Sequence, residues 1–161
     1  MTSPASERRQ RVLEERARAV AGARHAPREE GDRVLVFRVG GERFAVELGA
    51  VSLVLEASAI GGLVGAPPWL LGAALARSRL VPVLDLRQLL GLQGGGLSDL
   101  TRIVVVEHGG EEFGLAAEVL EGERSVQRDE VSPASSGPFR GVTADRTALL
   151  DLARLAPREE A

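Results

Sequence analysis

The clearest pattern in the sequence is a series of short runs in which apolar and polar residues alternate. Residues 33–39 alternate in this way, the glycine pair Gly40-Gly41 follows, and residues 43–48 resume the alternation. A period of two is typical of a strand with one buried face, and a glycine pair between two such runs favours a tight hairpin turn. The pattern therefore predicts a β-hairpin at the start of the alternating region.

Runs of the same kind follow. Val51, Leu53 and Leu55 alternate with other residues in a third expected strand. Residues 72–76 and 80–84 have the composition expected of two more strands. These runs are short and separated by turn-forming residues, which is typical of an all-β fold.

Prolines and a capping residue mark breaks between the expected strands. Because proline cannot donate a hydrogen bond inside a sheet, the proline pair at 67–68 predicts a turn, and we expect a short helical piece at residues 69–71. Asp85, with Gln88 three residues later, resembles a capping box and predicts a short helix over residues 86–90.

The pattern restarts in the second half of the chain. Residues 33–44 read RVLVFRVGGERF and residues 102–113 read RIVVVEHGGEEF, with six of these twelve positions identical. The triplet Leu-Asp-Leu at 84–86 also recurs at 150–152. The repeat indicates two similar halves of about five short strands each. Because closing a sheet removes its exposed edges, we expect two small barrels packed together.

Residues 1–31 differ from the rest of the chain in composition. They are rich in Arg, Glu and Ala, and residues 6–24 are good helix formers with a thin apolar face. Pro27 interrupts the pattern. We expect a helical or partly disordered N-terminal extension, which is either a solvated helix or a helix that docks on a partner.

Composition narrows the function classes. The chain has no cysteine and no lysine, which removes thiolate nucleophiles, Schiff-base lysines and the phosphate-loop lysine. With only His25 and His108, a histidine metal site is hard to assemble, and we expect no cofactor. A net charge of −3 and 3% aromatic residues argue against nucleic-acid binding. No apolar stretch approaches the roughly 20 residues that span a bilayer, so we expect a cytoplasmic protein without membrane insertion.

Two aspartates are the candidates for catalysis. Asp85 and Asp151 each follow an apolar strand and precede a leucine-containing helical turn. Helix capping explains both residues, and an acid/base pair is the weaker interpretation. Gly40-Gly41 and the later pair at 109–110 precede strands rather than helices, so they favour hairpin turns over a phosphate-binding loop. We therefore expect a protein that is not an enzyme.

Two apolar positions are candidates for contact with a partner. Trp69 either plugs one end of a barrel or anchors an interface. Val54 lies between Leu53 and Leu55, so both faces of that strand carry apolar groups. A closed barrel buries only one face, and the other can meet the second half, a partner or solvent.

Several short motifs, in their order and spacing between residues 33 and 156, resemble the CheW-like domain family. The motifs are Val36-Phe37-x-x-Gly40 with Phe44, Ala66-Pro67-Pro68-Trp69-x-x-Gly72, Arg77-x-x-Leu80-Val81-Pro82-Val83-Leu84-Asp85-Leu86-Arg87, Thr101-Arg102-Ile103-Val104-Val105-Val106, Phe139-Arg140-Gly141-Val142 and Leu149-Leu150-Asp151-Leu152.

The resemblance implies two intertwined five-stranded SH3-like barrels in a domain of residues 32–158. The first barrel would come mainly from residues 33–92 and the second mainly from residues 100–150, with strand exchange. The resemblance also implies a cytoplasmic adaptor without catalysis. Such an adaptor couples the cytoplasmic tip of a chemoreceptor to the regulatory domain of a CheA-type histidine kinase.

By position in the family, five residues would border the partner-binding surfaces: Val51, Leu53, Leu55, Gly72 and Arg77. For Arg77 the resemblance leaves two roles open. It contacts a partner, or it buttresses the junction of the barrels through hydrogen bonds.

The chain departs from the family at two places. Leu75-Ala76-Arg77-Ser78 stands where members commonly have Asn-Leu-Arg-Gly, so Ser78 replaces a turn glycine, and Leu53 stands where members often carry an acidic residue. These departures favour a divergent adaptor in a pathway that need not be chemotactic. The alternative is a CheW-like barrel redirected to another protein partner outside a receptor array.

Overall fold

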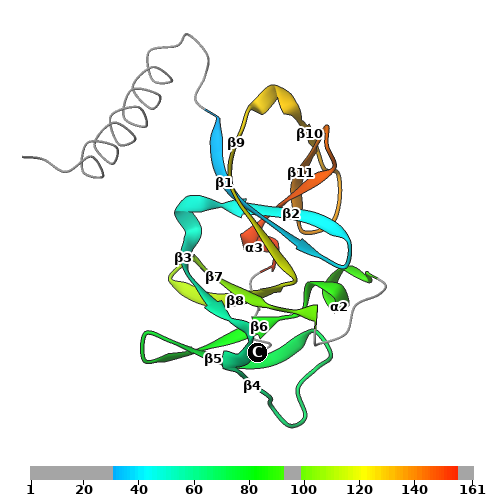
Figure 1. Ribbon diagram of the computed structural model, residues 1–161. Helices are drawn as coiled ribbons and strands as arrows, with labels where there is room; N and C mark the ends of the chain where they lie inside the picture. Colours follow the sequence, from blue (N-terminus) through cyan, green and yellow to red (C-terminus); the bar gives the residue numbers. More distant parts are fainter. Residues whose placement is uncertain (1–30, 93–98, 156–161) are drawn as a thin grey trace, which may run out of the picture. The chain divides into compact units, whose positions relative to one another are not determined.

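Strands make up most of the described part of the protein, as the alternating pattern predicts. The computed structural model describes residues 31–92 and 99–155 (Figure 1). The expected helix at residues 6–24 lies outside these ranges, so the division into an extension of residues 1–31 and a domain of residues 32–158 stays a prediction.

Twelve strands and five short helical elements are described. The strands are β1 (Asp32–Val39), β2 (Glu42–Glu47), β3 (Val51–Glu56), β4 (Ile60–Gly61), β5 (Leu70–Ala76), β6 (Arg79–Leu84), β7 (Arg102–His108), β8 (Glu111–Ala117), β9 (Val119–Val126), β10 (Val131–Pro133), β11 (Phe139–Thr143) and β12 (Thr147–Leu150). The 3-10 turns are η1 (Leu48–Ala50), η2 (Ala57–Ala59) and η4 (Arg128–Glu130), and the α-helices are α2 (Leu86–Leu90) and α3 (Leu152–Leu155).

The strands form two curled six-stranded sheets. Sheet A has the order β10-β11-β12-β2-β1-β9 and sheet B has the order β3-β7-β8-β6-β5-β4. The first two strands of each half therefore lie in the sheet to which the other half contributes four strands (Figure 1). Parallel pairing of β12 with β2, and of β6 with β8, joins the two halves within each sheet. This exchange confirms the expected pair of intertwined barrels.

The largest hydrophobic cluster lies between the two sheets. Phe37 and Phe44 reach it from sheet A, Val104 and Phe113 reach it from sheet B, and all four side chains are buried. The neighbouring positions on the same strands point the opposite way and fill two smaller clusters, one in each barrel. Strands β1, β2, β7 and β8 are thus apolar on both faces, because one face lines a barrel and the other packs against the second barrel.

The short helices begin as the aspartates predict. The Asp85 carboxylate accepts a hydrogen bond from the backbone N–H of Arg87 at 3.0 Å, and the Asp151 carboxylate accepts one from Ala153 at 3.1 Å. Each aspartate N–H donates to a carbonyl oxygen of a preceding loop, that of Trp69 or Pro138. Both carboxylates therefore act as N-caps at equivalent places in the two halves.

The expected helical piece at residues 69–71 is wrong. The backbone N–H of Leu70 donates to the Pro67 carbonyl and closes a single turn, after which β5 begins at Leu70. Leu70 pairs with Leu84 of β6 and packs against the core between the sheets. Sheet pairing thus continues where the proline pair suggested a helix, because burial at this position outweighs a local preference.

Ion pairs connect the strands of sheet A across its outer surface. Glu121 on β9 binds Arg38 and Arg43, and Asp145 in the β11–β12 turn binds Arg124 on β9. Hydrogen bonds, first from the Arg124 guanidinium and then from the Thr143 hydroxyl, hold the pKa of Asp145 well below its usual range. The contact ties the tip of the β11–β12 hairpin to the edge strand β9.

We expect Asp145→Asn to reduce the free energy of unfolding at pH 7 by about 0.5–1 kcal/mol, a small value because the pair is partly exposed and screened by solvent. Since the folded-state pKa of Asp145 is lowered, its contribution is present above about pH 4 and is lost as the pH falls through the folded-state pKa. Urea unfolding of both proteins between pH 7 and pH 2.5 measures this difference. A difference that grows on acidification would contradict the assignment.

Candidate functional site

The five predicted partner-binding residues all lie in sheet B. Val51, Leu53 and Leu55 belong to β3, an edge strand that pairs with β7. Gly72 belongs to β5, and Arg77 lies in the turn between β5 and β6. The structure thus brings the five residues into one sheet, on two strands and a turn.

The three apolar side chains of β3 are half-buried against the core. Val51 packs against the cluster between the sheets, whereas Leu53 and Leu55 pack against the cluster inside barrel B. A bulge at Ser52 separates these two directions, because the register with β7 shifts between Val51 and Leu53. Val54 and Glu56 are the exposed residues of this strand, and the Val54 side chain is 38% exposed.

Gly72 is required by the close approach of two strands. A Cβ atom at this position would lie 2.0 Å from the carbonyl oxygen of Gly61 on β4. Gly141 is the equivalent residue of β11, where a Cβ atom would lie 2.7 Å from the Ser132 carbonyl oxygen on β10. Each glycine also follows a register shift in its strand pairing. These facts support a structural role for Gly72, which is buried.

Arg77 fastens the tip of the β5–β6 hairpin. Its Nη2 donates to the backbone carbonyl of Ser52 on β3 at 3.1 Å, at the position of the bulge. The contact lies within sheet B and not at the junction of the two barrels. Arg77 and Ser78 both have positive φ, 49° and 68°, as a type I′ hairpin turn requires. The replacement of the family's turn glycine by Ser78 therefore leaves the turn in a left-handed conformation.

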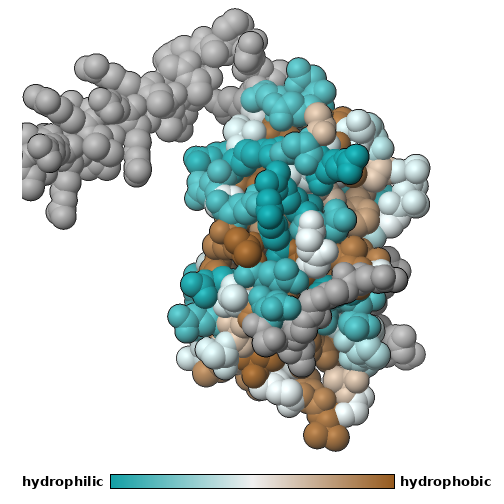
Figure 2. All heavy atoms as spheres, turned by 45° about the vertical axis from the view of Figure 1, so that its right-hand side comes forward, coloured by the Kyte–Doolittle hydropathy of each residue, from teal (hydrophilic) through white to brown (hydrophobic). Residues whose placement is uncertain are grey.

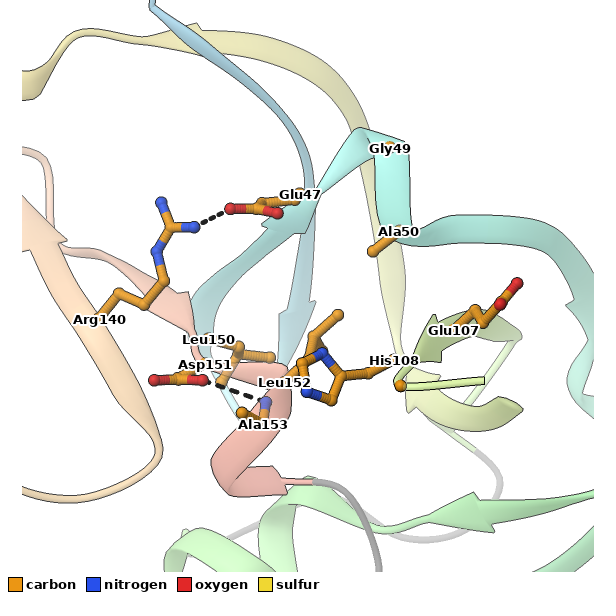
Figure 3. A pocket seen from close by; sticks show the side chains of 11 residues that line it. Glu47, Gly49, Ala50, Glu107, His108, Arg140, Leu150, Asp151, Leu152 and Ala153 are labelled. Carbon is orange, nitrogen blue, oxygen red and sulfur yellow. Dashed lines mark hydrogen bonds and ion pairs between the residues drawn. The ribbon is translucent and has the colours of Figure 1, made fainter. Parts of the chain in front are cut away.

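A groove of about 380 Å³ lies beside the junction of the sheets (Figure 3). The side chains of Glu47, His108, Arg140 and Asp151 line it together with apolar residues of β12 and α3. Arg140 is bound to Glu47, and Asp151 caps α3. Three of the charged groups of the groove are therefore engaged in contacts within the protein.

Sequence reasoning missed one exposed pair of leucines. Leu75 on β5 lies directly opposite Leu80 on β6, and their side chains are 60% and 75% exposed. The signal was present in the alternation, because Ala74, Ala76 and Val81 are the buried neighbours. Trp69, by contrast, is half-buried and packs against the core between the sheets, which supports its role as a plug.

No cluster of three potential metal ligands occurs within residues 31–92 and 99–155. In the same ranges, no helix has the length and apolarity needed to cross a membrane. The geometry defines a protein of two packed barrels, with apolar side chains exposed on sheet B and a polar groove beside the junction.

Comparison with known proteins identifies the family of this protein. Residues 33–160 match the CheW-like domain, so the chain belongs to that family. Over 72 residues it is 39% identical to Protein PilI of Pseudomonas aeruginosa, a match that covers 45% of this chain and 40% of PilI. Over 107 residues it is 26% identical to the chemotaxis protein CheW of Bacillus subtilis, covering 66% of this chain and 69% of that protein.

A solved structure supports the fold. The scaffolding protein TtCheW from Thermoanaerobacter tengcongensis superposes with a TM-score of 0.67 at 21% identity, covering 74% of this chain and 88% of that chain. The chain thus belongs to the family of scaffold and adaptor proteins that its sequence motifs resemble.

We expect Gly72→Ala to destabilise the protein by about 3 kcal/mol, because the new methyl group would overlap a backbone oxygen that only a shift of β4 can move. Gly49→Ala is the matched control, since no atom lies within 4 Å of a Cβ at that position. Thermal unfolding followed by circular dichroism compares the two variants. Equal effects would show that the approach of β4 does not decide the residue at position 72.

We expect Ser78→Gly to stabilise the protein by about 1 kcal/mol, because glycine adopts the left-handed conformation without the steric cost of a Cβ atom. Ser125→Gly in β9 is the control, and there glycine is expected to destabilise. Urea unfolding measures both changes. If both variants lose stability, residue 78 is not under backbone strain.

Proposed function

We propose that the protein is a non-catalytic cytoplasmic adaptor that couples a chemoreceptor to a CheA-type histidine kinase in a signalling array. Membership of the CheW-like domain family over residues 33–160 is the observation that carries this proposal. The Asp85 and Asp151 carboxylates cap helices, so the two candidates for catalysis already have structural roles. The adaptor acts by position, holding a kinase barrel and a receptor tip in a geometry that couples receptor state to autophosphorylation.

The surfaces that we assign to this coupling border sheet B and the groove beside the junction. Val51, Leu53, Leu55, Gly72 and Arg77 form or shape the first surface. Since Val51, Leu53 and Leu55 pack partly against the core, the adjacent Val54 is the β3 side chain that offers direct apolar contact. Each such contact buries less than the roughly 800 Å² per partner of a stable interface, so single contacts are weak and the array supplies avidity.

We further propose that the signalling output differs from chemotaxis. The relative that is 39% identical over its matched segment carries the name Protein PilI, and this name does not refer to chemotaxis. Leu53 and Ser78 also depart from the residues common in the family. The second candidate function is a CheW-like barrel that serves another protein partner outside a receptor array, and the partially apolar outer surface of sheet B would suit that role as well.

Cross-linked pull-down of the tagged full-length protein from its native cells tests the adaptor function. We expect a histidine kinase and a receptor to be recovered together, and Val54→Glu to lower the recovery of one of them several-fold. Val142→Glu on β11 is the matched control, because Val142 is 37% exposed and Val54 is 38% exposed. Leu53→Glu should instead unfold part of the protein, since Leu53 packs inside barrel B.

Recovery of neither a kinase nor a receptor, with the protein folded and abundant, would reject the adaptor function. Recovery of a different protein partner that depends on Val54 would support the second candidate. Equal losses with Val54→Glu and Val142→Glu would show that β3 has no particular part in the interface.

A further inference from the structure

The two barrels share a topology but not their surface chemistry. In Figure 2, teal predominates over the part of the protein that carries the upper strands of sheet A, whereas brown and white are more frequent over the part with sheet B. The ion pairs of Arg38 and Arg43 with Glu121 account for the polar character of sheet A. Equivalent places in the two barrels can therefore differ in what they hold.

Beside the β1–β2 hairpin, side chains fill the space next to the turn glycine. The Gly40 N–H donates to the Glu118 carboxylate at 2.9 Å. A Cβ atom at Gly40 would lie 3.4 Å from the Leu92 Cβ and 3.8 Å from the Arg87 Cγ. Arg87 is buried, and its guanidinium binds the Asp85 carboxylate through Nε at 3.1 Å and Nη2 at 3.3 Å. An arginine of the chain thus occupies this place, on the aspartate that caps α2.

Beside the β7–β8 hairpin the corresponding space is open. The repeat aligns Glu118 with Gly49, and the recurring Leu-Asp-Leu triplet aligns Arg87 with Ala153, so neither side chain has a counterpart. A Cβ atom at Gly109, the equivalent of the first turn glycine, would have no atom of the described residues within 4 Å. Gly49, Gly109 and Ala153 all line the groove of about 380 Å³ beside the junction of the sheets. The groove is therefore the unfilled counterpart of the Arg87 site.

The lining of the groove combines apolar and charged side chains. Its apolar part includes Leu150 and Leu152, and its acidic part includes Glu47 and Asp151. Arg140 is bound to Glu47 and offsets its charge, whereas Asp151 lies at the start of α3 (Figure 3). Arginine suits such a lining, because its aliphatic stem packs on apolar groups while its guanidinium binds a carboxylate.

The Asp151 carboxylate retains acceptor capacity for a guanidinium. One oxygen accepts from the Ala153 N–H at 3.1 Å, and the other lies 3.5 Å from Nε of Arg154, whose side chain is 53% exposed. The equivalent pair of Arg87 with Asp85 is shorter, at 3.1 Å, and its side chains are only 7% and 6% exposed. Because an ionised carboxylate has about four lone-pair sites, Asp151 can bind a further guanidinium from the groove.

We propose that the groove beside the β7–β8 hairpin binds an arginine side chain of a protein partner, in the place that Arg87 occupies beside the β1–β2 hairpin. The stem of the partner's arginine packs over Gly109 and Ala153, and its guanidinium binds Asp151. The chain itself indicates the occupant, because the equivalent site holds an arginine on the equivalent aspartate. The proposal rests on the proposed function in one respect, that the ligand of an adaptor is a protein segment.

Nuclear magnetic resonance titration of the isotope-labelled full-length protein tests the ligand chemistry. The probe is the peptide acetyl-Ala-Leu-Arg-Leu-Ala-amide. The matched peptide has citrulline, which has nearly the same shape without the charge, in place of arginine. We expect the arginine peptide to shift the backbone amide signals of Gly109 and Ala153, and to bind at least about fivefold more tightly than the citrulline peptide.

Filling the groove from the chain itself locates the site. Ala153→Arg places an arginine where the first half has Arg87, and we expect it to weaken the arginine peptide about tenfold or more. Ala59→Arg in η2 is the matched control, since it adds the same side chain at an exposed alanine outside the groove. Asp151→Asn should weaken the peptide several-fold while α3 keeps its cap, because asparagine is also a good N-cap residue. Circular dichroism melting verifies that each variant is folded.

The variant Arg158→Gln distinguishes an arginine of a partner from one of this chain. Arg158 follows α3 in the sequence and lies outside the described residues. We expect the arginine peptide to bind this variant and the wild type equally. Binding to the variant but not to the wild type would overturn the proposal, because the groove would then hold an arginine of the chain itself.

Three further outcomes would overturn the proposal: no binding of the arginine peptide, equal binding of the two peptides, or equal weakening by Ala153→Arg and Ala59→Arg. These outcomes are separate from those of the pull-down. Peptide binding in the groove without recovery of a kinase or receptor would support this proposal and reject the adaptor function. Recovery of both partners by the Ala153→Arg variant as well as by the wild type, without peptide binding, would reject only the proposal.

Discussion

The fold depends on four strands that must be buried on both faces. Strands β1, β2, β7 and β8 line the interior of one barrel with one set of side chains and pack against the other barrel with the alternate set. Phe37 and Phe113 are fully buried between the sheets, and Val36 and Val105 are buried inside their barrels. A charged side chain at one of the buried central positions of these strands would be desolvated without a partner. The two barrels are therefore not independent units, because each completes its sheet with two strands from the other half of the chain.

With the inner faces fixed in this way, the outer faces are free to differ, and they do. Sheet A carries a network of arginines and carboxylates that ties β1, β2 and β9 to the β11–β12 turn. The β5–β6 hairpin in sheet B has exposed leucines on its outer face, in a segment that contains no acidic residue. Two halves that share topology, capping aspartates and glycines at crossing strands thus present surfaces of opposite chemistry.

In each sheet a hairpin tip is held against an edge strand, but the two sheets use different contacts. In sheet A an ion pair between Arg124 and Asp145 holds a hairpin tip against edge strand β9. In sheet B the corresponding hairpin is held against edge strand β3 by a hydrogen bond from Arg77 to the Ser52 carbonyl. Gly72 and Gly141 allow the short strands β4 and β10 to cross closely in each barrel. The requirement shared by the two halves is geometric, because backbone spacing demands a glycine at Gly72 and at Gly141.

The sequence was sufficient to predict the all-β class, the paired barrels, the hairpin turns and the capping roles of Asp85 and Asp151. These predictions came from the alternation, the internal repeat and the motifs that resemble the family. These features are local or repeated, and local hydrogen bonding and periodicity determine them. The sequence did not show that Leu70 and Leu71 join a strand, because the pairing partner of Leu70 is Leu84, fourteen residues away. Nor could it show that Leu53 and Leu55 turn toward the core while Val54 faces outward. A bulge at Ser52 sets that direction, and only the register with β7, a strand of the other half, places the bulge. The side chains that face solvent were decided by strand exchange, since the same alternating pattern is compatible with either face until the partner strand is known.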